Sequence, residues 1–137
     1  MKALTAKQYM QICDATEAQC VHAALLLGRT FKGHDFNWIP EGVKAGHYTA
    51  STVKVHGVDR YLVAHHASPQ GGLVINAVAQ LTPSICDMAV LVSAFKELAL
   101  KHGCKWIEGI TQRAGMLKEL LKQGFKPVGV CVELELA

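Results

Sequence analysis

The chain has 137 residues, a length that suits one domain able to bury about two-thirds of its unfolded surface without disulfides or metals. Hydrophobic residues make up 50% and charged residues 18%, which is a globular composition and excludes an intrinsically disordered chain. The formal net charge of +3 is small and its lysines are scattered, so nucleic acid is not indicated as a partner.

The five cysteines are odd in number and form no C-x-x-C pair, which suits a reducing compartment. Cys13, Cys20 and His22 match none of the usual zinc-ligand spacings, so we expect no metal site. The first ten residues hold no apolar run typical of a signal peptide, and the longest uncharged stretch, 67–86, is interrupted by glycines and prolines. We therefore expect a cytoplasmic protein that does not contact a membrane.

The first predicted element is a helical region that starts after Thr5 and runs to Leu27, with a restart at Asp14, which has capping-box spacing to Glu17. Glycines and Pro40 then predict a loop over 28–46. This loop is aromatic and carries Phe31, Phe36, Trp38 and Ile39 among polar neighbours. Apolar anchors ringed by polar groups are typical of an interface, so we expect this loop to contact a protein partner. The alternative is that these side chains close the core beneath the first helix.

Residues 48–56 and 60–67 alternate, are rich in β-branched residues and flank a Gly57 turn, which predicts a β-hairpin. Residues 73–81 predict a third strand, apolar enough to be central. The remaining pattern is helix 84–102, strand 105–111, helix 113–123 and a last strand over 128–136. In this last strand valines and leucines at even positions alternate with Gly129, Cys131, Glu133 and Glu135.

Two short motifs lie in this second half. Ala99 and Gly103 end one helix as Ala-x-x-x-Gly, and Lys122, Gly124 and Phe125 end the next as Lys-x-Gly-Phe. This half resembles the C-terminal half of the GNAT superfamily of acetyl-CoA-dependent N-acetyltransferases. The resemblance implies an α/β (α+β) fold, with residues 1–137 as a single domain built on a mixed central sheet flanked by helices. It also implies parallel pairing between strands 73–81 and 105–111.

The resemblance places a cofactor site on the strand-to-helix turn 83–89, where the family holds the acetyl-CoA diphosphate on glycine-rich backbone. The candidate cofactor residues are Ser84, Ile85, Cys86, Asp87, Met88 and Ala89, together with Ala77, Val78 and Ala79 of the preceding strand. However, no glycine occurs between Gly72 and Gly103, and the Asp87 carboxylate repels a diphosphate. We therefore expect no cofactor, and acetyl-CoA only if the protein is active.

The family's catalytic tyrosine corresponds to Leu120, so the usual general acid is missing. Alternative bases are His65, His66 and Glu108; the two histidines are adjacent on a strand and point to opposite faces. Each of the three is also compatible with an ordinary surface or hydrogen-bonded residue.

Two functions remain open. The first is a structural or partner-binding protein with a degenerate acetyl-CoA site, which binds another protein or its own copy. The chain is also similar to small bacteriophage virion proteins with a GNAT-like tail. A phage particle is therefore a second expected location, in addition to the cytoplasm. The second is a divergent acetyl-CoA-dependent N-acetyltransferase.

Overall fold

A five-stranded mixed sheet with strand order β1-β2-β3-β4-β5 organises the chain. We describe it from a computed structural model, which describes residues 9–83, 86–111, 114–129, 132 and 134–136. The strands are β1 (Met10–Asp14), β2 (Thr49–Val55), β3 (Val58–Ala67), β4 (Gly72–Gln80) and β5 (Trp106–Gly109). All neighbours pair antiparallel except β4 and β5, which pair parallel.

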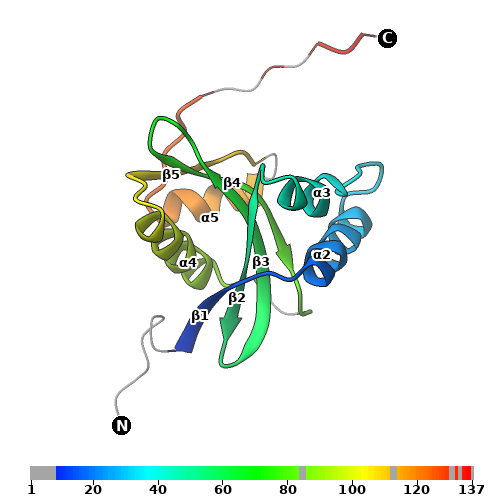
Figure 1. Cartoon of the computed structure of the whole chain (residues 1–137). Coiled ribbons are helices and arrows are strands. Elements are labelled where there is room, and N and C mark those ends of the chain that lie inside the picture. Colours follow the sequence, from blue (N-terminus) through cyan, green and yellow to red (C-terminus); the bar gives the residue numbers. More distant parts are fainter. Residues whose placement is uncertain (1–8, 84–85, 112–113, 130–131, 133, 137) are drawn as a thin grey trace.

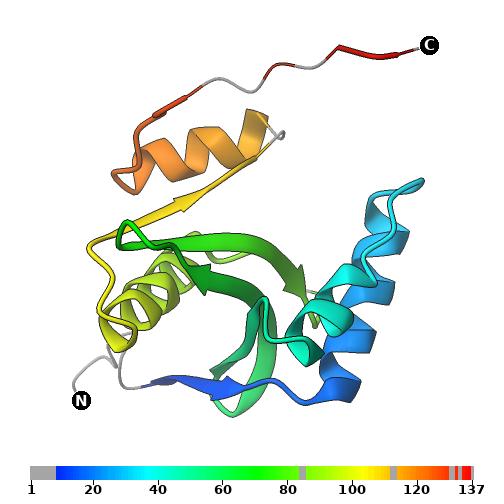
Figure 2. The same ribbon diagram turned by 45° about the horizontal axis from the view of Figure 1, so that its top comes forward.

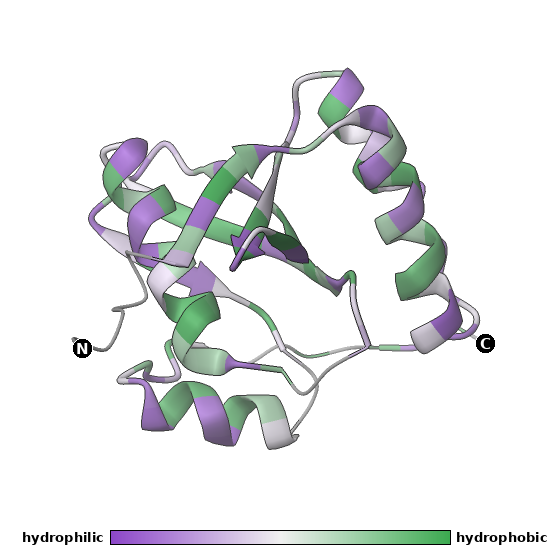
Figure 3. Ribbon diagram, turned by 90° about the horizontal axis from the view of Figure 1, so that it is seen from below, coloured by the Kyte–Doolittle hydropathy of each residue, from purple (hydrophilic) through white to green (hydrophobic). Residues whose placement is uncertain are grey.

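Helices lie on both faces of this sheet (Figure 1). The helices α2 (Glu17–Thr30) and α3 (Trp38–Lys44) cover one face, and α4 (Met88–Lys101) covers the other. The helix α5 (Ala114–Lys122) follows β5. Hydrophilic and hydrophobic residues alternate along the helices, as expected where one side of each helix faces the sheet (Figure 3). No helix in the described ranges is long and apolar enough to cross a bilayer.

Alternation along β3 divides the interior into two cores. Tyr61 and Val63 join Leu98 and other α4 residues in what we call the α4-side core. Leu62 and Ala64 point the opposite way, into the α2-side core with residues of α2 and α3. Because successive strand residues face opposite sides, one strand supplies both cores with fully buried side chains.

The predicted hairpin and the predicted parallel pairing are both confirmed. Strands β2 and β3 are joined by a two-residue turn in which His56 and Gly57 have φ of 50° and 78°. Positive φ at both central positions fits the right-handed twist of a hairpin. Strand β4 pairs parallel with β5 after the α4 crossover. The predicted mixed sheet flanked by helices is therefore correct.

The predicted helical region is wrong in its described first part, up to Asp14, and correct in its second part, because residues 17–27 lie in α2. Residues 10–14 form β1, which pairs antiparallel with β2, and residues 1–8 lie outside the described residues. The start of α2 is capped by Thr16 and not by Asp14. The Thr16 hydroxyl accepts the Gln19 N–H at 3.2 Å, and the Gln19 side-chain oxygen accepts the Thr16 N–H at 2.8 Å. The capping box was therefore predicted two residues too early.

The predicted loop over 28–46 is largely helical. Helix α2 continues to Thr30, and α3 occupies residues 38–44. Pro40 lies in the first turn of α3, where its missing N–H breaks no helical bond. Gly28, Pro40 and Gly42 are thus accommodated within helices, whereas residues 31–37 and 45–46 stay outside them, with Gly33 and Gly46 at positive φ.

The predicted last strand is not present at the described positions of 128–136. Val128, Val132, Leu134 and Leu136 are 82–87% exposed. Figures 1 and 2 show this segment leaving the end of α5 and running away from the domain. Helix α4 starts at Met88, later than the predicted position 84; residues 84 and 85 lie outside the described residues.

Candidate functional site

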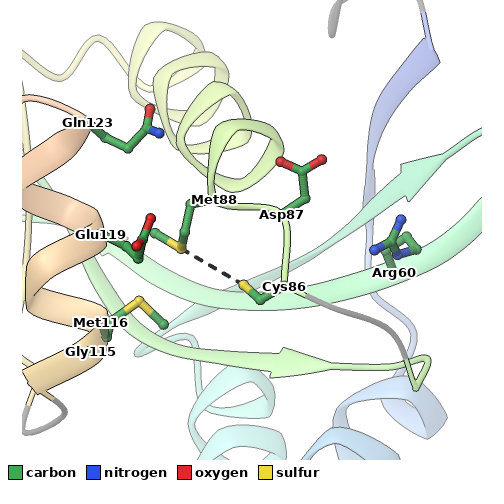
Figure 4. A pocket seen from close by; sticks show the side chains of 8 residues that line it. All are labelled: Arg60, Cys86, Asp87, Met88, Gly115, Met116, Glu119 and Gln123. Carbon is green, nitrogen blue, oxygen red and sulfur yellow. Dashed lines mark hydrogen bonds between the residues drawn. The ribbon is translucent and has the colours of Figure 1, made fainter.

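A cavity of about 840 Å³ opens between the start of α4 and α5. Figure 4 shows its lining, which comes from β3, from the turn before α4 and from α5: Arg60, Cys86, Asp87, Met88, Gly115, Met116, Glu119 and Gln123. Three residues of the predicted cofactor turn, Cys86, Asp87 and Met88, therefore line one cavity. Of the other three, Ser84 and Ile85 lie outside the described residues and Ala89 does not line the cavity.

The Asp87 carboxylate occupies the N-terminus of α4. Its Oδ1 accepts the Val90 N–H at 3.2 Å, so Asp87 is the N-cap of the helix. Its own N–H donates to the Tyr61 hydroxyl at 2.8 Å. Two amides at this helix start, those of Asp87 and Val90, are thus used within the protein, and a negative charge already lies where the helix dipole favours an anion.

Tyr61 is a part of this region that sequence reasoning missed. It comes from β3, its side chain is fully buried, and its hydroxyl accepts the Asp87 N–H. Burial raises the pKa of Tyr61, so the hydroxyl keeps its proton at neutral pH. The strand alternation placed Tyr61 on a face with Val63, but no local pattern indicated that this face meets the start of α4.

The charges around the cavity are mixed. Arg60 contributes a cation, and its guanidinium carbon lies 5.5 Å from the centre of the Tyr61 ring. Asp87 and Glu119 contribute carboxylates, and Glu119 pairs with Lys122 at 3.2 Å. The Cys86 thiol donates to the Met88 sulfur at 3.9 Å, so the wall between these charges is sulfur-rich.

Strands β4 and β5 diverge next to the cavity. They pair only over Gly72–Ile75 and Trp106–Gly109, so the described residues of β5 offer no partner to the second half of β4. That half holds the candidates Ala77, Val78 and Ala79, which pair instead with β3. Ala77 and Ala79 pack in the α2-side core and Val78 in the α4-side core. Only Val78 therefore faces the α4 side of the gap.

His65 and His66 point to opposite faces, as predicted. His65 is buried, its Nε2 lies 3.0 Å from the Ser51 hydroxyl oxygen, and its ring centre lies 5.6 Å from that of His102. Burial, reinforced by the charges of His102, Lys101 and His66, lowers the pKa of His65 to about 4, so it is neutral at pH 7. His66 lies 2.8 Å from the Asn76 amide nitrogen through Nδ1.

Both histidines line a second cavity of about 320 Å³, together with His47, Tyr48 and His102, and neither lines the cavity at α4. Glu108, the third candidate base, accepts the Trp106 indole N–H at 2.9 Å and lines neither cavity. The structure therefore does not bring the three candidate bases to the candidate cofactor turn. In the described ranges no three His, Cys, Asp or Glu side chains are placed to hold a metal ion.

The aromatic residues predicted to contact a partner form a chain of ring contacts over the α2-side core. Ring centres lie 6.0 Å apart for Phe31 and Phe36, 6.4 Å for Phe36 and Trp38, and 5.3 Å for Trp38 and Tyr48. Ile39 is fully buried, so its assignment to a contact surface is wrong. Phe31, Phe36 and Trp38 remain partly exposed.

Solved structures of known proteins share this architecture. The aminoglycoside N-acetyltransferase AAC(6′)-Iy in complex with CoA has a TM-score of 0.62 at 13% identity, covering 93% of this chain and 95% of its own. A ribosomal-protein-alanine N-acetyltransferase from Brucella melitensis gives 0.63 at 10%, covering 93% and 99%. A transcriptional regulator from Bacillus halodurans gives 0.63 at 19%, covering 93% and 100%.

This chain has the GNAT fold. No protein-family profile matches the sequence, and no curated protein matches it either. At these identities the likeness shows the fold alone, so the chemistry has to be argued from the residues of this GNAT-fold protein.

The cofactor implied by the fold is CoA, and the start of α4 does not fit its diphosphate. A diphosphate needs free backbone amides and close approach at the helix N-terminus. Here the Val90 N–H is taken by Asp87 and the Asp87 N–H by Tyr61, and the capping group is an anion. Of the described cavity-lining residues only Arg60 is a cation, against the carboxylates of Asp87 and Glu119. Because Lys122 pairs with Glu119, Asp87 is the carboxylate whose charge disfavours a polyanion at this helix start.

Proposed function

We propose that this GNAT-fold protein acts as a structural, partner-binding component and does not use acetyl-CoA. The observation that carries the proposal is the Asp87 carboxylate, which caps α4 at the position where the cofactor diphosphate would have to lie. A second support is the number of exposed large apolar side chains at the β5 end of the molecule, including Ile110 at 84%. Exposed apolar groups that gather in one region are typical of an interaction surface. A phage particle as the setting rests on the sequence resemblance alone.

The test is a titration with acetyl-CoA followed by thermal unfolding. A ligand at about 100 times its dissociation constant stabilises a protein by about 2.7 kcal/mol, which corresponds to several degrees for a domain of this size. We expect no such rise in Tm for the wild type at about 1 mM acetyl-CoA. A rise of several degrees would refute the proposal.

Two variants show whether the stated cause is correct. Asp87→Asn keeps an oxygen that can accept the Val90 N–H but removes the charge, and Cys86→Gly with Met88→Gly opens the turn. If the Asp87 charge and the side chains of Cys86 and Met88 exclude the cofactor, a protein with all three substitutions is expected to show a rise in Tm with acetyl-CoA that the wild type lacks. Glu119→Gln, at the α5 side of the cavity, is the matched control for removing a carboxylate.

A divergent acetyl-CoA-dependent N-acetyltransferase is the second candidate. It is favoured by the cavity of about 840 Å³ beside the diverging half of β4, a place open enough for a pantetheine arm. In that case the wild type would bind acetyl-CoA in the same titration and release free CoA thiol when an amine acceptor is added.

A further inference from the structure

Sulfur atoms gather in the cavity at the start of α4. Its lining includes the Cys86 thiol and the thioethers of Met88 and Met116. Of the other methionines, Met1 lies outside the described residues and Met10 is buried in the α4-side core. Cys86 is the exposed one among the described cysteines. One cavity therefore holds an accessible thiol and two thioethers, which are soft ligands of the kind that select Cu⁺.

The distance between two of these sulfurs fits a shared metal ion. The Cys86 Sγ and the Met88 Sδ lie 3.9 Å apart. A thiolate binds Zn²⁺ at ~2.3 Å, and Cu⁺ has the same filled d shell. Two sulfurs that bind one ion at ~2.3 Å, with about 120° between the two bonds, lie ~4.0 Å apart. Cys86 and Met88 are thus spaced as two ligands of one trigonal ion.

Met116 lies on the opposite wall of the cavity. Figure 4 shows its side chain extending from α5 toward the turn that carries Cys86 and Met88. Methionine is unbranched and has three rotatable bonds, so its sulfur can reach an ion without a shift of the backbone. None of the described side chains of α5 is buried. An ion bound from both walls would therefore tie this helix to the start of α4.

The surroundings favour a cation and a thiolate. The Asp87 carboxylate, between Cys86 and Met88 in the chain, caps α4 and brings negative charge to this turn. The Tyr61 hydroxyl accepts the Asp87 N–H and keeps its own proton, because burial, and to a smaller extent a hydrogen bond to the Cys86 side chain, raises the pKa of Tyr61. It can therefore donate to the Cys86 thiolate, an outer contact that orients a metal ligand. Figure 4 shows the cation Arg60 on the far side of Cys86 from the two methionines.

We propose that Cys86, Met88 and Met116 bind one Cu⁺ ion in a trigonal site made of sulfur alone. On binding, the Cys86 thiol releases its proton to water. The thiolate and the two thioethers each give an electron pair to the ion, whose oxidation state does not change. Zinc is disfavoured, because its structural sites use four ligands and this site offers one thiolate and two thioethers. The lack of a His, Cys, Asp or Glu cluster in the described ranges does not exclude this site, since two of its ligands are methionines.

The test is a titration of the reduced protein with Cu⁺ in the absence of oxygen, in competition with a chromophoric Cu⁺ chelator. We expect one ion per chain. We also expect a rise in Tm of the copper-loaded protein, because an ion that binds the folded state stabilises it. X-ray absorption at the copper edge is expected to show sulfur ligands alone, at ~2.3 Å. Zn²⁺ at about 100 µM is expected to cause no rise in Tm.

Four variants assign the ligands. Met116→Leu keeps the size of the side chain and removes its sulfur, so Cu⁺ binding is expected to weaken by about tenfold or more while the Tm without copper stays that of the wild type. Cys86→Ser removes the thiolate and is expected to weaken binding by about 100-fold or more. Met10→Leu and Cys104→Ser remove a thioether and a thiol outside the cavity. These two controls are expected to bind Cu⁺ as the wild type does.

No binding of Cu⁺ against the chelator, or binding that Met116→Leu leaves as tight as the wild type, would overturn the proposal. An equal loss of affinity in Cys104→Ser and Cys86→Ser would also overturn it, because the ion would then bind accessible thiols without a built site. Zinc binding as tight as that of Cu⁺ would do the same. Acetyl-CoA is absent from these measurements, so the copper site and the proposed function can fail separately.

Discussion

Two buried residues of β3, Tyr61 and His65, carry polar groups into the α4 side of the molecule, and each has a partner there. Tyr61 accepts the Asp87 N–H, and His65 lies within hydrogen-bond distance of Ser51. The strand therefore does more than fill the core, because it fixes the start of α4 at Tyr61 and lies beside its end at His65, near His102. Burial of His65 within hydrogen-bond distance of Ser51 favours the neutral form of its imidazole.

The low pKa of His65 predicts a loss of stability in acid. Its folded-state pKa of about 4 lies below the ordinary value of 6.5, so the unfolded chain binds more protons between these pH values. The stabilisation is present in full above about pH 6.5 and is lost as the pH falls toward 4. The difference corresponds to roughly 3 kcal/mol of unfolding free energy, to be measured by urea denaturation at several pH values.

The neighbouring histidine supplies the control for this effect. His65→Gln retains a group that can bond Ser51 and is expected to flatten the pH dependence between pH 4 and 6.5. His66→Gln, on the opposite face of the same strand, is expected to keep most of the wild-type slope, because burial is the largest cause of the low His65 pKa and the charge of His66 comes after those of His102 and Lys101. Equal slopes in the wild type and in His65→Gln would show that another group is responsible.

At this scale the sequence predicted local features and missed tertiary ones. The absence of glycine in the turn before α4, the position of Asp87 and the opposite directions of His65 and His66 follow from adjacency in the chain. The bond from Asp87 to Tyr61 joins residues 26 positions apart, and the burial of His65 beside His102 depends on where α4 ends. No spacing or period in the sequence indicates that these residues meet in the fold.

At the scale of elements, two helical glycines that looked alike in the sequence have different surroundings. Gly28 lies inside α2, and a Cβ built on it would meet no atom within 4 Å. Gly42 is buried inside α3, and a Cβ there would overlap the Tyr48 ring, which packs edge-on against Trp38. The first glycine only costs helix propensity, whereas the second makes room for a packed aromatic ring.

The same substitution is therefore expected to have opposite effects at these positions. Gly28→Ala should stabilise the protein by about 0.5–1 kcal/mol, because alanine restricts the unfolded chain and favours the helix. Gly42→Ala should destabilise it by about 1–3 kcal/mol, the usual cost of overpacking. The measurement is the free energy of unfolding in urea for both variants. The same sign of change in both would contradict this account of α2 and α3.

The length and regularity of each element explain which elements the sequence predicted. Helices α4 and α5 and the β2–β3 hairpin have long, regular periods and were found, with small errors at their ends. Helix α3 has only seven residues, with Pro40 and Gly42 among them, so its sequence resembles a loop. Strand β1 has five residues, too few for its alternation to be distinguished from a helical period, and it is specified by pairing with β2.

For the whole molecule, the central sheet couples the two cores. The α4-side core and the α2-side core contain different helices, yet both are built on consecutive residues of β3. Unfolding of one core therefore destabilises β3, on which the other core is also built. A domain of this size with a shared sheet is expected to unfold as one cooperative unit.

This coupling can be tested with a probe in one core and a cavity in the other. Leu98 of α4 is buried in the α4-side core, so Leu98→Ala should cost about 2–5 kcal/mol. Trp38 packs against the α2-side core and is one of two tryptophans, so a Trp106→Phe background leaves its fluorescence as a local probe. We expect Leu98→Ala to lower the urea midpoint of Trp38 fluorescence by as much as that of far-ultraviolet circular dichroism. A Trp38 transition that stays at the midpoint of the background protein would mean that α2 and α3 keep their core after α4 is released. In that case β3 and the α2-side core would stay folded without the α4-side core, and the two cores would belong to separate folding units.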